Sequence, residues 1–242
     1  MILADTRHRL TRDDAQLAAR LLAQEIGEDV DRVESRLVDE GIDAILDDPR
    51  LPRALLRNPR GAYASFALFA YVMIRHALRR AGVEDRGVAD YVTSIVVHFG
   101  KHGQAQRIAE SDDEVYGALF ELAEDVDDRD FRRSFLVRTH LGNYALWLSG
   151  IFPDYVEARR WRKGGPDLEY YEEMGRRGFE LAADHKLAEQ YGMAPLFSSV
   201  AARFPLLRVA LNDVSDSLFF PTVQTPDRLM RQVADETRWK LR

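Results

Sequence analysis

Seven polar and aromatic side chains between residues 131 and 191 have the types and the spacing of a ligand site. On a helix over residues 131–150, four of them fall on one side: His140, Asn143, Tyr144 and Trp147. A second helix, predicted over residues 167–191, carries the other three: Tyr170, Tyr171 and His185. An imidazole at His140 or His185 would serve as acid or base, and a phenol at Tyr144 or Tyr171 would donate a hydrogen bond. The pattern predicts a small-molecule or catalytic site between the two helices.

The same side chains have a second interpretation, in which they hydrogen-bond one another and fix how the helices pack. An unpaired buried polar group costs about 1–3 kcal/mol, so such groups meet each other, the backbone, water or a ligand. Gly142, Gly175 and Gly178 lack side chains and would let the two helices approach closely. Both interpretations expect His140 and Tyr144 to point into the bundle, and only the site requires a pocket there.

A basic run follows the first of these helices and surrounds Trp161. Its cations form a candidate anion-binding site, because phosphate and nucleic-acid contacts combine basic and aromatic groups: Arg159, Arg160, Arg162 and Lys163. Two other interpretations stay open. Cations at the end of a helix complement its dipole, and the acid-rich stretch 112–130 is near enough in sequence to pair with them. The chain's net charge of −6 favours internal or subunit pairing over nucleic acid.

Metal and cofactor signatures are absent from the sequence. His98 and His102 are four residues apart, but Gly100 between them and Gly103 after them end the helix that would align them. The chain has no cysteine, no HExxH motif and no Glu-x-x-His pair. It also lacks GxGxxG after a strand, GxxxxGK[ST] and GxSxG. We therefore predict no metal site and no cofactor.

The elements that position these residues are all predicted to be helices. Helical periodicity with glycine and proline punctuation runs through the chain, and no stretch alternates as a strand does. Thr11 and Asp14 have the pattern of a capping box before a helix over residues 12–26. Another helix is expected to begin at Ser111. The sequence predicts an all-α fold, a single compact bundle of about nine or ten helices over residues 1–242.

Three further stretches refine this picture. Residues 63–80 are apolar on almost every side until Arg75 and predict the most buried helix. Residues 49–60 contain three prolines and four arginines and form a connector with one helical turn, the candidate hinge. The last helix begins at Thr225-Pro226-Asp227. We expect four of its side chains to face inward: Leu229, Met230, Val233 and Trp239.

Composition bounds the class of protein. A hydrophobic content of 46% with a charged content of 31% is typical of a globular chain and excludes disorder. The cysteine-free sequence fits a reducing compartment. The longest apolar run, residues 62–74, is shorter than the ~20 residues that a membrane span needs, and the first residues show no apolar signal segment. The sequence predicts a soluble cytoplasmic protein with no membrane partner.

These observations leave two functional hypotheses. The first is a protein that acts by binding a protein partner or by self-association, as a homo-oligomer, because amphipathic helices commonly build interfaces and no catalytic signature is present. The alternative is a helical small-molecule binder or enzyme with its site between the helices at 131–150 and 167–191. Whether the protein is an enzyme stays open at this point.

Overall fold

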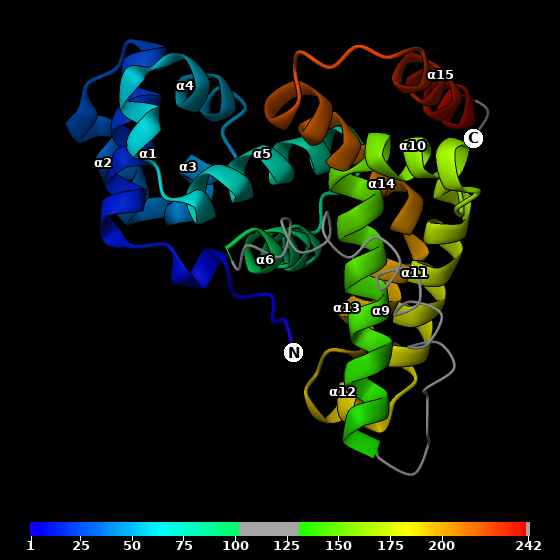
Figure 1. Ribbon diagram of the computed structural model, residues 1–242. Helices are drawn as coiled ribbons and strands as arrows, with labels where there is room; N and C mark the ends of the chain where they lie inside the picture. Colours follow the sequence, from blue (N-terminus) through cyan, green and yellow to red (C-terminus); the bar gives the residue numbers. More distant parts are fainter. Residues whose placement is uncertain (102–130, 241–242) are drawn as a thin grey trace. The chain divides into compact units, whose positions relative to one another are not determined.

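The computed structural model describes residues 1–101 and 131–240, which fold into helices throughout (Figure 1). Within these ranges there are thirteen α-helices, two short 3-10 segments and one π-helical segment, and no residue lies in a strand. The all-α prediction is confirmed. The predicted helix at Ser111, the acid-rich stretch 112–130 and His102 lie outside the described residues.

The chain divides into two compact units at residue 101. The N-terminal unit comprises residues 2–101, and the C-terminal unit is described from Phe131 onward. Each unit is treated by itself below, and the single domain over residues 1–242 stays a prediction. The candidate hinge at 49–60 lies inside the N-terminal unit, where it forms a helix and a 3-10 turn.

The N-terminal unit packs α1 against α2 and α4, and α5 against α6. Its elements in chain order are η1 (Arg7–Arg9), α1 (Arg12–Ile26), α2 (Val30–Glu40), α3 (Ile42–Leu46), α4 (Leu51–Arg57), η2 (Pro59–Tyr63), α5 (Phe66–Arg80) and α6 (Arg86–Lys101). The predicted capping box is present: Thr11 and Asp14 exchange side-chain and backbone hydrogen bonds at the start of α1. Gly27 ends α1 in the left-handed conformation, with φ 70°.

Helix α5 lies in the core of this unit but begins later than predicted. Tyr63 belongs to η2 and is 83% exposed, and Ser65 caps α5 by accepting a hydrogen bond from the Leu68 amide. Every side chain from Leu68 to Leu78 except Phe69 is buried. Residues 88–97 of α6 are buried without a break, so α5 and α6 share the core equally.

A charged cluster around Asp47 joins the end of α3 to α5 and α6. The Asp47 carboxylate accepts hydrogen bonds from Arg75 at 2.8 Å and from Arg86 at 2.7 Å, while Arg79 donates to its backbone carbonyl. Burial alone would raise the pKa of Asp47, but the hydrogen bonds from Arg75 and Arg86 outweigh it and lower the pKa to about 2. The cluster therefore holds Asp47 ionised at neutral pH.

The C-terminal unit is built around α9, which packs against α11 and α14; α11 lies alongside α9 in Figure 1 and also packs against α13. Its elements are α9 (Phe131–Ile151), α10 (Pro153–Lys163), α11 (Leu168–Ala183), α12 (Lys186–Gln190), α13 (Ala194–Ala202), α14 (Phe204–Val214), the π-helical η3 (Ser215–Phe219) and α15 (Pro226–Lys240). The predicted helix over 167–191 is thus two helices, which meet at Asp184 and His185.

Small residues bring the helices of this unit close together, as the sequence predicts. A Cβ on Gly142 would lie 2.9 Å from the Phe179 ring, and one on Gly175 would lie 2.2 Å from the Phe204 ring. Both rings are fully buried. Aromatic side chains from α11 and α14 therefore occupy the space that side chains at the two glycines would need.

Helix α15 turns inward the face opposite to the one that we expected. Arg228 and Arg231 are 5% and 7% exposed and face the rest of the unit. Three of the side chains expected inward are instead 58%, 70% and 64% exposed: Leu229, Met230 and Val233. The reason is that α15 packs onto a surface of charged groups, described below, which pair with its arginines. The side chain of Trp239 lies outside the described part.

In the described ranges no single helix has both the length and the hydropathy of a membrane span, and the one pair that meets both together, Ala194–Ala202 with Phe204–Phe219, is bent by 73°.

Candidate functional site

The predicted polar stripe on α9 runs from solvent into the core. Leu136 is 47% exposed and His140 is also exposed, whereas all residues from 141 to 151 are buried. Asn143 and Trp147 are each 2% exposed, and the Tyr144 ring lies 6.0 Å from both the His140 and the Trp147 rings. The expectation that His140 points into the bundle is wrong: it is exposed, although Thr139 and Leu141 on either side of it are buried.

The residues expected opposite this stripe separate toward the two ends of α9. Tyr171 is 2% exposed and lies near Tyr144, and Tyr170 packs edge-on against it with ring centroids 5.9 Å apart. His185 instead caps α12, where its Nδ1 accepts a hydrogen bond from the Leu187 amide, and its ring lies 4.3 Å from that of Phe131 at the start of α9. The stripe is therefore divided, and His185 belongs to an aromatic cluster with Phe131.

Tyr144 occupies the most strongly perturbed position of the stripe. Burial raises the pKa of its phenol, the nearby Tyr171 and Tyr155 raise it further, and Arg159 lowers it. The hydroxyl is thus held protonated over the whole physiological range. Tyr144 lines neither the cleft among α10, α11, α14 and α15 nor the cavity formed by α4, η2 and α5.

The basic run at the end of α10 is also divided. Arg159 is 8% exposed, and its side chain packs against Gly165, where a Cβ would lie 3.2 Å from the Arg159 Cγ. Arg160, Arg162 and Lys163 are exposed in the last turn of the helix, where they complement its dipole. Arg160 lies over the Trp161 ring, 5.4 Å from its centroid, and 3.8 Å from the Glu157 carboxylate.

Arg208 on α14 is the centre of a buried charged network that the sequence analysis missed. Its side chain is 2% exposed and binds Glu172 of α11 at 2.5 Å and Asp235 of α15 at 2.5 Å. It also donates to Asn212 Oδ1 at 2.6 Å. Burial would lower the pKa of Arg208, but Asp235 and Glu172 reverse the effect and raise it. One guanidinium group thus links α11, α14 and α15.

Two more arginines extend this network to α10. Arg228 donates to Asp154 at 2.9 Å and to the Phe220 carbonyl at 2.8 Å. Arg231 donates to Asp216 at 2.9 Å and to Asp154 at 3.2 Å. These pairs explain why α15 turns its charged face inward: each buried guanidinium meets carboxylates that α10 and η3 supply.

The end of α9 is held by the same region. The Asn212 amide donates to the carbonyls of Ser149 and Gly150 at 2.7 and 2.8 Å, and the Ser215 hydroxyl donates to that of Ile151 at 2.6 Å. The last carbonyls of a helix have no partner within the helix, so α14 and η3 supply the donors that the end of α9 lacks.

A cleft of ≈ 630 Å³, here called the acidic cleft, lies among α10, α11, α14 and α15. Its charged lining holds six carboxylates and three guanidinium groups: Glu157, Asp167, Glu169, Glu172, Asp227 and Asp235, with Arg160, Arg208 and Arg231. Leu168, Met230 and Ala234 supply apolar surface, and Trp161, 68% exposed, stands at the edge. Since Arg208 already pairs with Glu172 and Asp235, the remaining lining is negative.

Glu157 is the carboxylate that this arrangement perturbs. Its side chain is 15% exposed, and burial raises its pKa above the usual value. Arg160 lowers that pKa, but Asp167 and Asp227 raise it again by repulsion, with a smaller opposing effect from Arg231. A carboxylate that is desolvated beside like charges in a cleft is a candidate ligand contact.

The sequence does contain patterns that indicate this charged network. Arg208 is the one charge between Arg203 and Asp213, in an otherwise apolar helix that also holds Asn212. Such a charge either reaches solvent or meets a partner. Arg228, Arg231 and Asp235 follow one another at spacings of three and four, which places them on one helix face.

No group of three or more His, Asp or Glu side chains in residues 1–101 and 131–240 is placed to hold a metal ion. His98 is exposed near the end of α6, and its predicted neighbour His102 is not among the described residues.

Comparison of the chain with protein-family models, with curated proteins and with solved structures found no match.

Proposed function

We propose that the protein acts by binding, and that its C-terminal unit takes an organic cation in the acidic cleft. The observation that carries the proposal is the cleft itself: a volume of ≈ 630 Å³ lined by an excess of carboxylates and bordered by an exposed tryptophan. Ligand sites are typically clefts of ~300–1,000 Å³ that combine apolar walls with a few convergent polar groups. The acidic cleft has both properties.

The charge distribution favours a cation over an anion. Within the described ranges Glu157 has one ion pair, the 3.8 Å contact with Arg160, and Asp227 has none. A positive ligand group between them would relieve the repulsion that raises the Glu157 pKa. An anion would add to that repulsion and would compete with carboxylates already bound to Arg208.

An extended organic cation fits the lining better than a small inorganic ion. The carboxylates are spread over α10, α11 and α15 rather than gathered around one point, and Leu168 and Met230 between them would contact methylene groups. Arg160 lies over one face of the Trp161 ring. An ammonium group that binds the other face of this 68% exposed side chain would gain about 0.5–2 kcal/mol. The ligand class that matches is an aliphatic di- or polyamine, or a basic side chain of a peptide.

Titration calorimetry with spermidine tests the proposal, with 1,6-hexanediol as an uncharged probe of similar apolar character. We expect spermidine to bind, hexanediol not to bind, and the affinity to fall with added salt because the contacts are ionic. Glu157→Gln and Asp227→Asn should each weaken binding by about tenfold, equal to about 1.4 kcal/mol. Glu173→Gln, an exposed residue of α11 outside the cleft, should leave it unchanged.

Two outcomes would overturn the proposal: no binding of spermidine at millimolar concentration, or binding that Glu157→Gln, Asp227→Asn and Glu173→Gln all leave equal to that of the wild type.

Self-association and a cytoplasmic location, which the sequence indicates through amphipathic helices and the absence of cysteine, stay predictions.

A further inference from the structure

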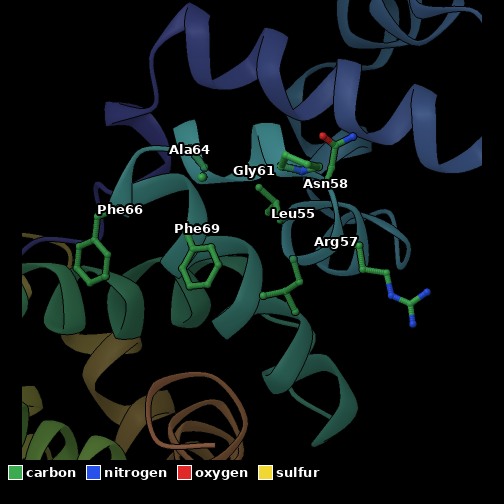
Figure 2. Close-up of a pocket in the computed structure, with 10 residues that line it drawn as sticks. Leu55, Arg57, Asn58, Gly61, Ala64, Phe66 and Phe69 are labelled. Carbon is green, nitrogen blue, oxygen red and sulfur yellow. The ribbon is translucent and has the colours of Figure 1, made fainter.

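A second cavity, here called the apolar groove, lies in the N-terminal unit and has a different character. It measures ≈ 550 Å³ and is formed by the end of α4, η2 and the first turn of α5. Leu55, Leu56, Phe66 and Phe69 supply its large apolar side chains. In Figure 2 the rings of Phe66 and Phe69 lie on one side of the view, and Arg57 lies at the other with its guanidinium pointing away from them.

The groove has a fixed backbone frame. Asn58 ends α4 and its side chain accepts a hydrogen bond from the Arg60 amide at 3.0 Å. A Cβ on Gly61 would lie 2.0 Å from the Leu55 carbonyl oxygen, so the η2 backbone packs directly on that of α4. The depression between α4 and α5 is therefore built by the chain path and does not depend on the rotamer of one side chain.

Apolar side chains remain accessible around the groove. Leu56 is 52% exposed, Phe66 is 37% exposed and the neighbouring Tyr63 is 83% exposed. Accessible apolar side chains gathered at one depression are typical of a surface that contacts another protein.

The residues around the groove carry positive charge, and not all of these cations are in ion pairs. Residues 49–69, which include the whole groove lining, contain four arginines and no aspartate or glutamate. Arg50 and Arg53 pair with Asp48 and Glu25, but the guanidinium groups of Arg57 and Arg60 have no hydrogen bond or ion pair within residues 1–101 and 131–240. An apolar depression with two available cations beside it is complementary to an acidic amphipathic segment.

From these contacts we infer that the apolar groove docks an acidic amphipathic helix of a partner protein. The bulky apolar side chains of that helix enter between Leu56 and Phe66, and its carboxylates face Arg57 and Arg60. A nucleic acid fits less well, because phosphate tracking needs several cations, whereas Arg57 is the only cation of residues 1–101 and 131–240 that lines the groove. This binding is independent of the acidic cleft in the other unit.

The test uses the full-length protein and fluorescence anisotropy with a labelled designed helix carrying leucine and phenylalanine on one face and glutamate on the other. A helix with the same apolar face and lysine in place of glutamate is the matched probe. We expect the acidic helix to bind more tightly than the basic one. Arg57→Glu should lower the affinity for the acidic helix by at least about tenfold, because an attractive charge contact at the interface becomes a repulsive one. The same variant should bind the basic helix more tightly than the wild type does.

Arg32→Glu is the matched control, an exposed arginine on α2 that does not line the groove, and should change neither affinity by more than about twofold. Phe66→Ala provides a second variant without a charge change and should weaken both helices by about tenfold, the scale of an aromatic interface contact. Circular dichroism of each variant checks that the helical fold is retained.

Several results would overturn the inference. One is equal binding of acidic and basic helices by the wild type, and another is an Arg57→Glu effect no larger than that of Arg32→Glu. Tighter binding of a single-stranded oligonucleotide than of the acidic helix would assign the surface to nucleic acid. A dimer in sedimentation equilibrium that Leu56→Glu dissociates would make the groove a contact between copies of the chain.

Discussion

Gly178 of α11 lies against the backbone of Gly142 in α9: a Cβ on residue 178 would be 2.8 Å from the Gly142 nitrogen and 3.0 Å from the Arg138 carbonyl oxygen. The neighbouring atoms are backbone atoms of a buried helix and cannot move aside as a flexible side chain would. The contact between α9 and α11 therefore requires glycine at this position.

Gly178→Ala should lower the free energy of unfolding by about 2–4 kcal/mol, because the added methyl group forces the two helices apart. Urea denaturation followed by circular dichroism measures the change. Arg177→Ala, at the next and exposed position of α11, should alter stability by less than about 0.5 kcal/mol. Equal effects of the two substitutions would show that α9 and α11 are not in this close contact.

Arg208→Met should destabilise the protein by about 3–5 kcal/mol, because the buried Glu172 and the partly buried Asp235 would lose the cation that both bind. Adding Glu172→Gln should restore part of the loss, since one uncompensated charge is then removed. Thermal unfolding of the single and double variants measures both effects. Arg176→Met is the control. It removes the exposed ion pair between Arg176 and Glu180, at 3.9 Å, and should lower the free energy of unfolding by less than about 1 kcal/mol. A double variant less stable than Arg208→Met would contradict the pairing.

Asp47→Asn should lower stability at pH 7 by about 2–4 kcal/mol, since Arg75 is buried and loses its carboxylate. The folded pKa of Asp47 is lowered to about 2, whereas the unfolded value is about 3.9. The stability that Asp47 contributes is therefore fully present above pH ~4 and is lost as the pH falls toward 2. Denaturation at pH 7, 4 and 2.5 should show the difference between variant and wild type shrinking. The exposed Asp39→Asn of α2 should show no such trend.

Glu157→Gln should stabilise the ligand-free protein at pH 7. Burial raises the pKa of Glu157 in the folded protein; Arg160 lowers this pKa, and Asp167 and Asp227 raise it further. The folded protein therefore loses stability as the pH rises from the pKa of Glu157 in the unfolded chain to its pKa in the folded protein. Below the unfolded pKa the wild-type carboxyl is protonated in both states, and the difference between the two proteins should vanish. Thermal unfolding between pH 3.5 and 8 measures it, with the exposed Glu173→Gln as the reference variant. A stabilisation that is greatest at acid pH would refute the assignment.

Local signals in the sequence were sufficient for much of the fold. The Thr11–Asp14 capping box and the left-handed Gly27 depend on residues close in the chain, and both are present. The same holds for Gly142, Gly175 and Gly178, whose missing side chains indicate a close approach wherever the partner helix lies. Gly41, with φ 82°, divides the amphipathic stretch 30–46 into α2 and α3, which adds a helix to the number predicted.

The orientation of α15 could not be predicted in this way. Its apolar residues indicate an inward face by the usual rule, but the surface that receives it carries Asp154, Asp216 and the buried Arg208, from three other elements. Which face turns inward depends on what the helix meets. The prediction for His140 was wrong for a related reason. Periodicity places His140 on the same side of the helix as Tyr144, but it does not show how far along α9 that side stays buried.

The acidic cleft could not be predicted from the sequence either, because it depends on which helices meet. Glu157, Asp167 and Asp227 come from separate helices or the residues that cap them, and nothing in their local context marks them as neighbours. The two helices expected to hold a site instead share a closely packed contact, and only the second of them reaches the cleft, through Leu168, Glu169 and Glu172.

The bond between Arg228 and Asp154 spans 74 positions of the chain, which has a consequence during synthesis. At ~5–20 residues per second, a ribosome adds Arg228 roughly 4–15 s after Asp154. By the end of that interval Glu172 and Arg208 have also been added, while Asp235 of α15 has not yet been made. The nascent C-terminal unit therefore passes through a period in which Asp154 lacks Arg228 and Arg208 lacks Asp235.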